Sequence, residues 1–322
     1  MRDWGSRFPS RDRSRGAGGG AAPFGVPYAI RGGRPRPSAA VTLVLLTGLA
    51  AVGLAGFMTF SSLFGGGSPA AAAQGPDAVP PPDPVGDASV LTANPLYATG
   101  EMTEVTCPAP ELDVDDKASM EAFLHEITDC LDEAWRAQFA EGGMDFEEPN
   151  RIFWYASGQS PCGNFPTEGT AAFYCQANKG LYLGVEDIVA NSNETEHPEA
   201  YTFLLSHEYG HHVQGEAGIL GYFHTERGAL SDPGERSLLT RRSELQANCL
   251  GGTFLGSVEE SLPVGPDEEA NILEDAERRG DFDPEERTHG SPENGAMWTA
   301  HGMDRGDPAA CNTWSAGENV VG

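Results

Sequence analysis

Apolar residues in the C-terminal two thirds of the chain recur first at helical spacing and then in short runs. Between residues 116 and 140 they recur every three or four positions, which predicts a helix with one face packed into a core. The runs Ile152–Ala156, Ala171–Gln176 and Leu181–Val185 have the length and the aromatic or branched side chains of strands. The last two runs flank residues 178–180 (Asn-Lys-Gly), a turn sequence that predicts a hairpin.

Helical signals dominate the remainder of the body. Pro198 opens a helix that is expected to run to about Gln214, because proline suits the first turn of a helix. Further helices are expected at about 239–255 and 267–279, and the tail after Pro292 is less regular. These elements predict an α+β domain, dominated by helices, with a small antiparallel sheet.

An uncharged apolar run covers residues 39–64 and separates two regions of opposite charge. Its 26 residues exceed the roughly 20 that cross a bilayer as a helix. Residues 1–38 hold eight Arg and two Asp, so the positive-inside rule places them in the cytoplasm and the body outside. We therefore expect a disordered Arg/Gly-rich cytoplasmic tail at 1–38, one transmembrane helix at 39–64, a Pro/Gly/Ala-rich linker at 65–105 and a folded domain at 106–322.

A cleaved signal peptide is the main alternative to this anchor. The Ala run at 70–73 offers a small-residue cleavage site, after which the protein would be secreted. The apolar run is longer than the roughly 7–15 residues of a signal peptide, which favours an uncleaved anchor in the cell membrane. A buried core helix fits neither the length of the run nor its flanking charges.

The body of the chain is strongly acidic. Of the 20 Lys and Arg and the 48 Asp and Glu in the chain, 12 and 46 lie after residue 38. Such a charge repels phosphates, which argues against nucleic acid as a partner. It is typical of solubility in a salty or extracellular medium, and an electrostatic preference for basic substrates is the other interpretation.

All six cysteines follow the apolar run. An even number of cysteines on the outer side of a membrane predicts three disulfides in an oxidising compartment. Fifteen pairings are possible, and sequence order favours Cys107–Cys130, Cys162–Cys175 and Cys249–Cys311. A zinc site made of cysteines is disfavoured, because the chain has no C-x-x-C pair.

Residues 207–211 read His-Glu-Tyr-Gly-His within the helix that Pro198 opens. Residues four apart share a helix face, so His207 and His211 can direct two imidazoles at one ion. Glu208 is rotated by about 100° around the axis, too far to ligate but well placed to take a proton from a water on the metal. Two surface histidines on an ordinary helix are the alternative, since the motif arises by chance in roughly 2% of such chains.

A carboxylate on the next predicted helix completes the ligand set. Glu244 lies 33 residues after His211. Two His and one Glu that leave the fourth coordination position of a zinc ion open form the arrangement typical of catalytic zinc sites. Asn248, one turn further on, lies on the same face and can accept a hydrogen bond from a ligand imidazole. Taken alone, Glu244 would be interpreted as a solvated carboxylate on a helix. Together with the two histidines, it indicates a site for one Zn²⁺ ion.

With these motifs the chain resembles the bacterial neutral zinc metallopeptidases. The resemblance covers about residues 94–315 and rests on several blocks in the same order. They are Asn94-Pro95-Leu96-Tyr97, Phe173-Tyr174-Cys175, Ser206 to Gln214, Glu244 to Cys249, His289-Gly290-Ser291, Trp298, and Gly306 to Thr313. The resemblance implies zinc bound by His207, His211 and Glu244, catalysis by Glu208, and a zincin-like fold of the gluzincin type.

Two positions depart from the family pattern. The family usually has Asp where this chain has Asn248, and a neutral amide accepts a hydrogen bond without making the imidazole more basic. The segment after His289-Gly290-Ser291 also differs, reading Pro-Glu-Asn-Gly where the family tends to have Gln-Arg. His289 is still the first candidate for stabilising an oxyanion, because the resemblance marks its segment.

These patterns predict a membrane-anchored zinc endopeptidase that acts outside the cytoplasm on protein or peptide substrates, with Glu208 as general base. The alternative is a surface binding module that keeps the fold but has little or no turnover, as the neutral Asn248 and the altered His289 segment would allow. Nothing in the sequence favours a zinc hydrolase for non-peptide bonds. Tyr209 is expected to pack, His212 to hydrogen-bond in the core, and the histidines at 125, 197, 224 and 301 to be structural or exposed.

Overall fold

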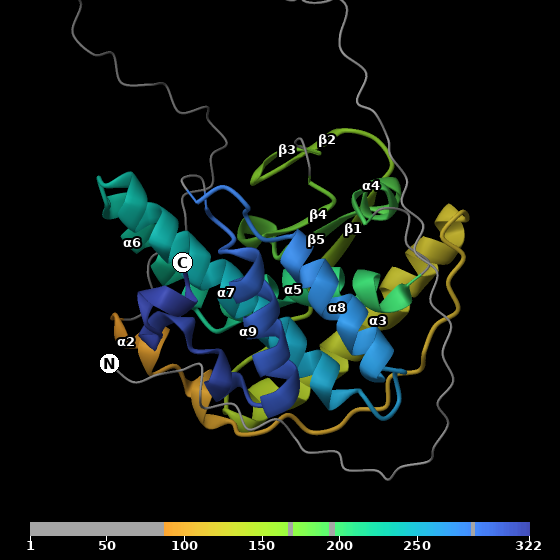
Figure 1. The fold of residues 1–322 in the computed structure, drawn as a ribbon, viewed down its shortest axis with the longest axis horizontal. Helices are drawn as coiled ribbons and strands as arrows, with labels where there is room; N and C mark the ends of the chain where they lie inside the picture. Colours follow the sequence, from red (N-terminus) through yellow and green to blue (C-terminus); the bar gives the residue numbers. More distant parts are fainter. Residues whose placement is uncertain (1–86, 167–169, 193–196, 285–286) are drawn as a thin grey trace, which may run out of the picture. The chain divides into compact units, whose positions relative to one another are not determined.

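The computed structural model describes residues 87–166, 170–192, 197–284 and 287–322 (Figure 1). The predicted cytoplasmic tail and transmembrane helix, and the linker up to residue 86, lie outside these ranges. Within them, no helix combines the length and the apolar character that a membrane crossing requires.

Helices make up most of the described chain, as the sequence predicts. They are α2 (Ser89–Thr92), α3 (Lys117–Glu141), α4 (Val185–Asn191), α5 (Pro198–Glu216), α6 (Ile219–Ala229), α7 (Pro233–Ser257), α8 (Pro266–Arg278) and α9 (Pro292–Arg305), with 3-10 turns at Pro95–Ala98, Gln176–Asn178, Pro308–Cys311, Thr313–Ser315 and Glu318–Val320. Four of these helices, α5, α7, α8 and α9, have proline in the first turn. Helix α3 begins directly after Asp116, whose carboxylate accepts the amide N–H of Ala118.

The strands form a small mixed sheet and a separate hairpin. Strand β5 (Gly180–Gly184) lies between β1 (Asn150–Trp154) and β4 (Ala172–Cys175). The β4–β5 pair is antiparallel, with Lys179 in the left-handed conformation at the turn, so the predicted hairpin is confirmed. The expected purely antiparallel sheet is wrong, because β1 pairs with β5 in parallel. Strands β2 (Gly158–Ser160) and β3 (Gly163–Phe165) form a second, two-stranded sheet.

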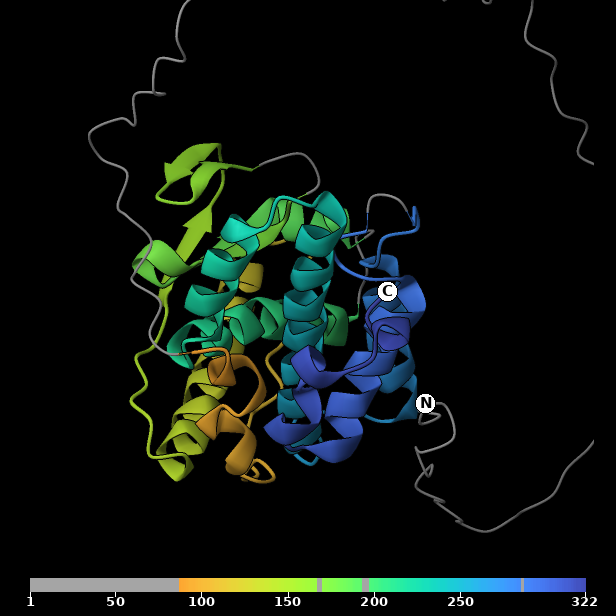
Figure 2. The same ribbon diagram turned by 90° about the vertical axis from the view of Figure 1, so that its left-hand side faces the viewer.

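Helices α5 and α7 lie at the centre, between α3 and the sheet on one side and α8 and α9 on the other (Figure 2). Glycines allow these helices to pack backbone against backbone. A Cβ atom on Gly210 of α5 would lie 2.8 Å from the carbonyl oxygen of Ala247 in α7, and one on Gly302 of α9 would lie 2.0 Å from that of Cys249. Because α5 and α7 approach so closely, side chains on their facing turns meet.

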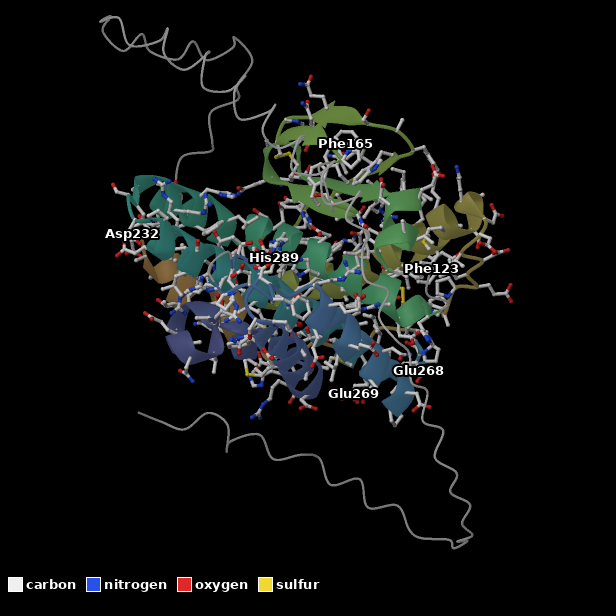
Figure 3. All side chains as sticks on the ribbon, turned by 45° about the horizontal axis from the view of Figure 1, so that its top comes forward. Phe123, Phe165, Asp232, Glu268, Glu269 and His289 are labelled. Carbon is white, nitrogen blue, oxygen red and sulfur yellow. A yellow bond between two sulfur atoms is a disulfide. The ribbon has the colours of Figure 1, made fainter. Side chains whose placement is uncertain are left out.

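Acidic side chains lie around this core. Asp232, Glu268 and Glu269 lie at the periphery of the molecule, whereas His289 lies in front of the central helices (Figure 3). These three carboxylates contribute to the acidic charge at the surface of the described body.

The folded body begins before residue 106, which corrects the predicted end of the linker. Leu96 is fully buried in the main core, and the amide of Asn94 donates hydrogen bonds of 3.0 and 2.9 Å to the carbonyl oxygens of Val90 and Ala217. Residues from Ser89 onward therefore pack against the end of α5 rather than serving as a spacer.

The tail after Pro292 is also more regular than predicted. Ser291 accepts the amide N–H of Asn294 at 3.2 Å and caps α9, a helix of 14 residues. The three predicted disulfides, Cys107–Cys130, Cys162–Cys175 and Cys249–Cys311, are all present. The last of them joins the central helix α7 to the turn at Pro308–Cys311.

Candidate metal centre

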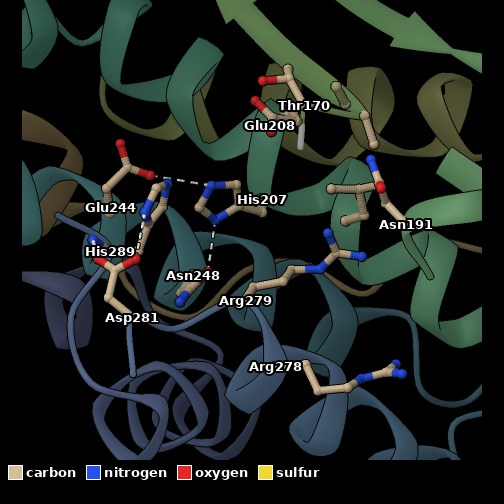
Figure 4. Close-up of a pocket in the computed structure, with 13 residues that line it drawn as sticks. Thr170, Asn191, His207, Glu208, Glu244, Asn248, Arg278, Arg279, Asp281 and His289 are labelled. Carbon is tan, nitrogen blue, oxygen red and sulfur yellow. Dashed lines mark hydrogen bonds and ion pairs between the residues drawn. The ribbon is translucent and has the colours of Figure 1, made fainter. Parts of the chain in front are cut away.

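Three side chains from α5 and α7 converge on one point. The Nε2 atoms of His207 and His211 lie 3.4 and 3.2 Å from the same carboxylate oxygen, Oε2 of Glu244 (Figure 4). One donor atom from each of the three residues lies within 4.8 Å of the others, and all three side chains are largely shielded from solvent. The structure thus brings together the three residues that the sequence proposes as ligands.

The second nitrogen of each imidazole is held by an amide oxygen. Nδ1 of His207 lies 2.7 Å from Oδ1 of Asn248, and Nδ1 of His211 lies 2.9 Å from Oε1 of Gln214. Because an amide oxygen accepts, both Nδ1 atoms carry a hydrogen in these bonds, and both Nε2 atoms face Glu244. There each Nε2 donates when it is protonated and offers a lone pair when it is not. The hydrogen bond from His207 to Asn248 is the one that the sequence predicts.

Gln214 belongs to a buried network that sequence reasoning missed. Its Nε2 donates to the carbonyl oxygen of Ser243 at 2.8 Å and to Oε1 of Gln246 at 3.0 Å, which turns its own oxygen toward His211. Gln246 in turn donates to the hydroxyl of Tyr97 at 2.7 Å and accepts the indole N–H of Trp314 at 3.0 Å. Only the position of Gln214, one turn after a ligand on the same helix face, could have signalled its role.

The electrostatics of the site favour a positive charge beside Glu244. Burial alone would raise the pKa of Glu244, but the charge of His211 and hydrogen bonds from both imidazoles hold it well below its usual value. Burial alone would lower the pKa of His211, but the carboxylate of Glu244 outweighs it and raises the pKa to about 9. A nitrogen lone pair would repel a carboxylate oxygen at 3.2–3.4 Å, so each of these contacts requires a proton or a metal ion between the two atoms.

Glu208 lies beside this centre without joining it. Its side chain is 8% exposed and lines both cavities that open onto the ligands. Figure 4 shows it near Thr170, on the side of His207 away from Asn248. A carboxylate that reaches the cavity but not the ligand cluster is positioned to exchange a proton with a molecule bound there.

His289 comes from the loop between α8 and α9 and lies beside Glu244 (Figure 4). Asp281, which sequence reasoning did not single out, holds this loop in place. Its Oδ2 accepts the backbone N–H groups of Thr288 at 2.5 Å and His289 at 2.6 Å, and its Oδ1 lies 3.4 Å from Nδ1 of His289. Among the described residues, Nε2 of His289 has no hydrogen-bond partner and can contact a molecule in the cavity.

The other histidines and Tyr209 lie outside the ligand cluster. His212 is fully buried between the hydroxyl of Tyr174 and the carbonyl oxygen of Glu147, as predicted. Tyr209 is also fully buried. His224 is exposed, as predicted, and it also lines the second cavity together with His211 and Glu244.

Comparison with known proteins identifies the family of this chain. The chain matches the family described as "Putative neutral zinc metallopeptidase" over residues 87–314. It belongs to that family. Among relatives, the uncharacterized protein YpfJ of Escherichia coli K12 is 28% identical over 204 residues, which cover 60% of this chain and 70% of YpfJ. The uncharacterized protein Rv2575 of Mycobacterium tuberculosis is 30% identical over 186 residues, 50% of this chain and 61% of that protein. No solved structure gave a significant match.

The family implies a zinc ion, and the donor set fits one. Ligand atoms placed about 2.0–2.1 Å from a tetrahedral zinc lie about 3.3–3.4 Å from one another. The observed separations from Oε2 of Glu244 to the two Nε2 atoms, 3.4 and 3.2 Å, agree with that geometry. Two imidazoles and one carboxylate leave the fourth position open, which distinguishes catalytic from structural zinc sites.

Proposed function

We propose that this chain is a zinc-dependent peptidase in which His207, His211 and Glu244 hold the metal and Glu208 is the general base. The convergence of two Nε2 atoms and Oε2 of Glu244 at zinc-like separations, with each Nδ1 fixed by an amide oxygen, carries the proposal. Membership of the metallopeptidase family and the open cavity beside the ligands support it.

Each residue has a distinct part in the reaction. Zinc in this site supplies a Lewis acid that polarises the scissile carbonyl and lowers the pKa of a water molecule to about 7. Glu208 accepts a proton from the attacking water at a carboxylate oxygen and passes it to the nitrogen of the leaving amine. His289, oriented by Asp281, donates an N–H to the oxygen that becomes negatively charged as water adds.

The membrane anchor and the outer location complete the proposal. Three disulfides in the described body support an oxidising compartment, and the charge asymmetry around residues 39–64 supports a cytoplasmic N-terminus. A protease added to intact cells should digest the body while sparing a tag placed before residue 39. A body protected from the protease until the cells are lysed would contradict the outer location.

The test of the enzymatic proposal compares the wild type with Glu208→Gln. Zinc stoichiometry should be one per chain in both proteins, and cleavage of a denatured protein substrate should disappear in Glu208→Gln. Glu133→Gln, an exposed substitution of the same kind on α3, serves as the control. Equal cleavage by the wild type and Glu208→Gln would show that the assignment of the base is wrong.

A binding module with little or no turnover is the second candidate, and one observation favours it. The oxygen that orients His207 belongs to an amide, Asn248, and not to a carboxylate. A neutral partner leaves the imidazole a weaker ligand than a carboxylate would. In this case the wild type would bind zinc and peptides but cleave nothing, and Asn248→Asp would increase zinc affinity or create turnover.

A further inference from the structure

The cavity beside the ligands extends to a pair of arginines. This cavity, of about 460 Å³, is lined by His207 and Glu208 at one part and by Asn191, Arg278 and Arg279 at another. A second cavity of about 430 Å³ shares His207 and Glu208 but continues to aromatic and aliphatic side chains. These are Phe173, Tyr174, Leu220 and Phe223. The space around the ligands therefore has one end with guanidinium groups and one largely apolar end.

Arg279 is held in a fixed position. Its Nε donates to Oδ2 of Asp275 at 2.6 Å and its Nη2 to the hydroxyl of Ser192 at 3.3 Å. Figure 4 shows its guanidinium reaching from the side of Asn248 toward Asn191. The side chain is 25% exposed, and within the part of the chain that the structure describes its Nη1 has no protein partner. A guanidinium anchored at one edge presents its remaining N–H groups to the cavity without further ordering.

Arg279 shares its carboxylate partner with a second arginine. Asp275, which is 2% exposed, pairs with both Arg278 at 2.9 Å and Arg279 at 2.6 Å, so one carboxylate serves two cations. Asp281 also lines the cavity, but its oxygens are engaged by backbone N–H groups and by His289. In a body with only 12 basic residues against 46 acidic ones, two arginines on one cavity wall stand out.

We propose that Arg279, assisted by Arg278, binds a carboxylate of the substrate at this end of the cavity. The proposal rests on the peptidase function and names its specificity. Guanidinium groups bind carboxylates through paired N–H donors, and such charge-assisted bonds gain strength in a partly enclosed site. The acidic surface repels anions only over roughly the 8–10 Å that salt leaves unscreened, whereas Arg279 acts in direct contact.

Two parts of a peptide can supply this carboxylate, an acidic side chain or the free C-terminus. Peptide pairs separate them. In the first set, the two peptides of each pair differ only in having Glu or Gln at one of six positions around a cleaved bond. In the second set, they differ only in having a free or an amidated C-terminus. Either Glu at one position or the free terminus should raise kcat/KM by about 10- to 100-fold, the range for a hydrogen bond to a charged group. Equal rates within every pair would overturn the proposal.

Variants of the arginine show whether Arg279 causes the preference. In Arg279→Gln the ratio of kcat/KM between the two members of the preferred peptide pair should fall to about one. Arg279→Lys keeps the pairing with Asp275 and should retain part of the preference, which guards against a folding defect in the glutamine variant. Arg305→Gln removes the same charge from an exposed position on α9 and should change nothing. An unchanged preference in Arg279→Gln would overturn the assignment.

Binding keeps this inference separate from the proposed peptidase function. Zinc-loaded Glu208→Gln and wild type are titrated with the same fluorescein-labelled octapeptides, and anisotropy gives Kd for the acidic and neutral member of each pair. One outcome is that no peptide is cleaved, the acidic peptide binds more tightly than the neutral one, and Arg279→Gln removes this difference in Kd. That outcome would contradict the peptidase function and support the carboxylate site. The other outcome is that peptides are cleaved, but the acidic and neutral members of each pair have the same Kd and the same kcat/KM. That outcome would support the peptidase function and contradict the carboxylate site.

Discussion

The side-chain oxygen of Asn248 lies 2.7 Å from Nδ1 of His207 and fixes the tautomer of a proposed zinc ligand. The contact joins α5 to α7 one turn away from Glu244, so one helix supplies both a ligand and the support for another ligand. His211 is supported differently, by Gln214 from its own helix. Both supports are neutral amides, which orient the imidazoles but add no negative charge.

Replacing this amide by a carboxylate should strengthen the site. In Asn248→Asp a negative charge faces Nδ1–H of His207 and makes Nε2 more basic, so we expect zinc affinity to rise by about 10-fold or more. Asn248→Leu removes the acceptor and should lower affinity by about 10- to 100-fold. Competition with a chromophoric chelator measures both values. Asn164→Asp on the exposed strand β3 adds the same charge elsewhere and should have no effect; lower affinity in Asn248→Asp would contradict the argument.

His289 should contribute to turnover but not to metal binding. Its ring is turned by Asp281 and lines the cavity without being one of the three converging donors. We expect His289→Gln to reduce kcat by about 100- to 1000-fold, the range for one lost oxyanion donor, with zinc affinity within about two-fold of the wild type. Steady-state kinetics and zinc titration check the two parts. Asp281→Asn should lower kcat less, and a loss of zinc from His289→Gln would show a ligand role instead.

The sequence predicted those elements whose signal lies within one segment. The helix expected at 116–140 is α3 (Lys117–Glu141), and the one expected at 267–279 is α8 (Pro266–Arg278). Helix α9 was missed because Pro, Asn and Gly at its start are typical of loops. It is stabilised by tertiary packing: a Cβ on Gly295 would lie 2.9 Å from the carbonyl oxygen of Ala276, so α8 and α9 touch at this glycine.

Long-range pairing could not be predicted in the same way. The hairpin of β4 and β5 has a local turn signal, whereas the parallel pairing of Asn150 with Gly180 depends on how α3 and the sheet pack. The site shows the same division. His207 and His211 follow from helical spacing, but Asp281 and Arg279 reach the cavity only through contacts between separate helices and loops.

Tyr209, although inside the His-Glu-Tyr-Gly-His segment, should matter for stability and not for the metal. Its hydroxyl donates to the buried carboxylate of Asp132, which also pairs with Arg151. Burial raises the pKa of Tyr209 well above its usual value, so the phenol stays a donor. Tyr209→Phe leaves Asp132 one donor short, and we expect a loss of about 1–3 kcal/mol in unfolding free energy.

Urea unfolding and zinc titration measure the two effects of Tyr209→Phe. Zinc affinity should stay within about two-fold of the wild type, since the phenol contacts no proposed ligand. Tyr155→Phe, on an exposed tyrosine that also contacts a carboxylate, should change stability by no more than about 0.5 kcal/mol. Equal stability of Tyr209→Phe and the wild type would show that the hydroxyl is dispensable.

His212 should make the body less stable in mild acid. Burial lowers its pKa from 6.5 to about 4, against the raising effect of its hydrogen bond to the carbonyl oxygen of Glu147. The folded protein therefore keeps the imidazole neutral, while the unfolded chain takes up a proton below about pH 6.5. The stability that His212 contributes is complete above pH 6.5, is lost as pH falls toward 4, and amounts to about 3 kcal/mol at most.

This acid sensitivity can be isolated by removing the titrating group. His212→Gln keeps a donor for the carbonyl oxygen of Glu147 but does not titrate. Its unfolding free energy should be lower than that of the wild type at pH 7.5. Between pH 6.5 and 4.5 its unfolding free energy should decrease less than that of the wild type. Measurements in chelator exclude any contribution from metal release. His125→Gln, on an exposed position of α3, should follow the wild-type pH profile. Parallel profiles for the wild type and His212→Gln would mean that another group sets the acid limit of the fold.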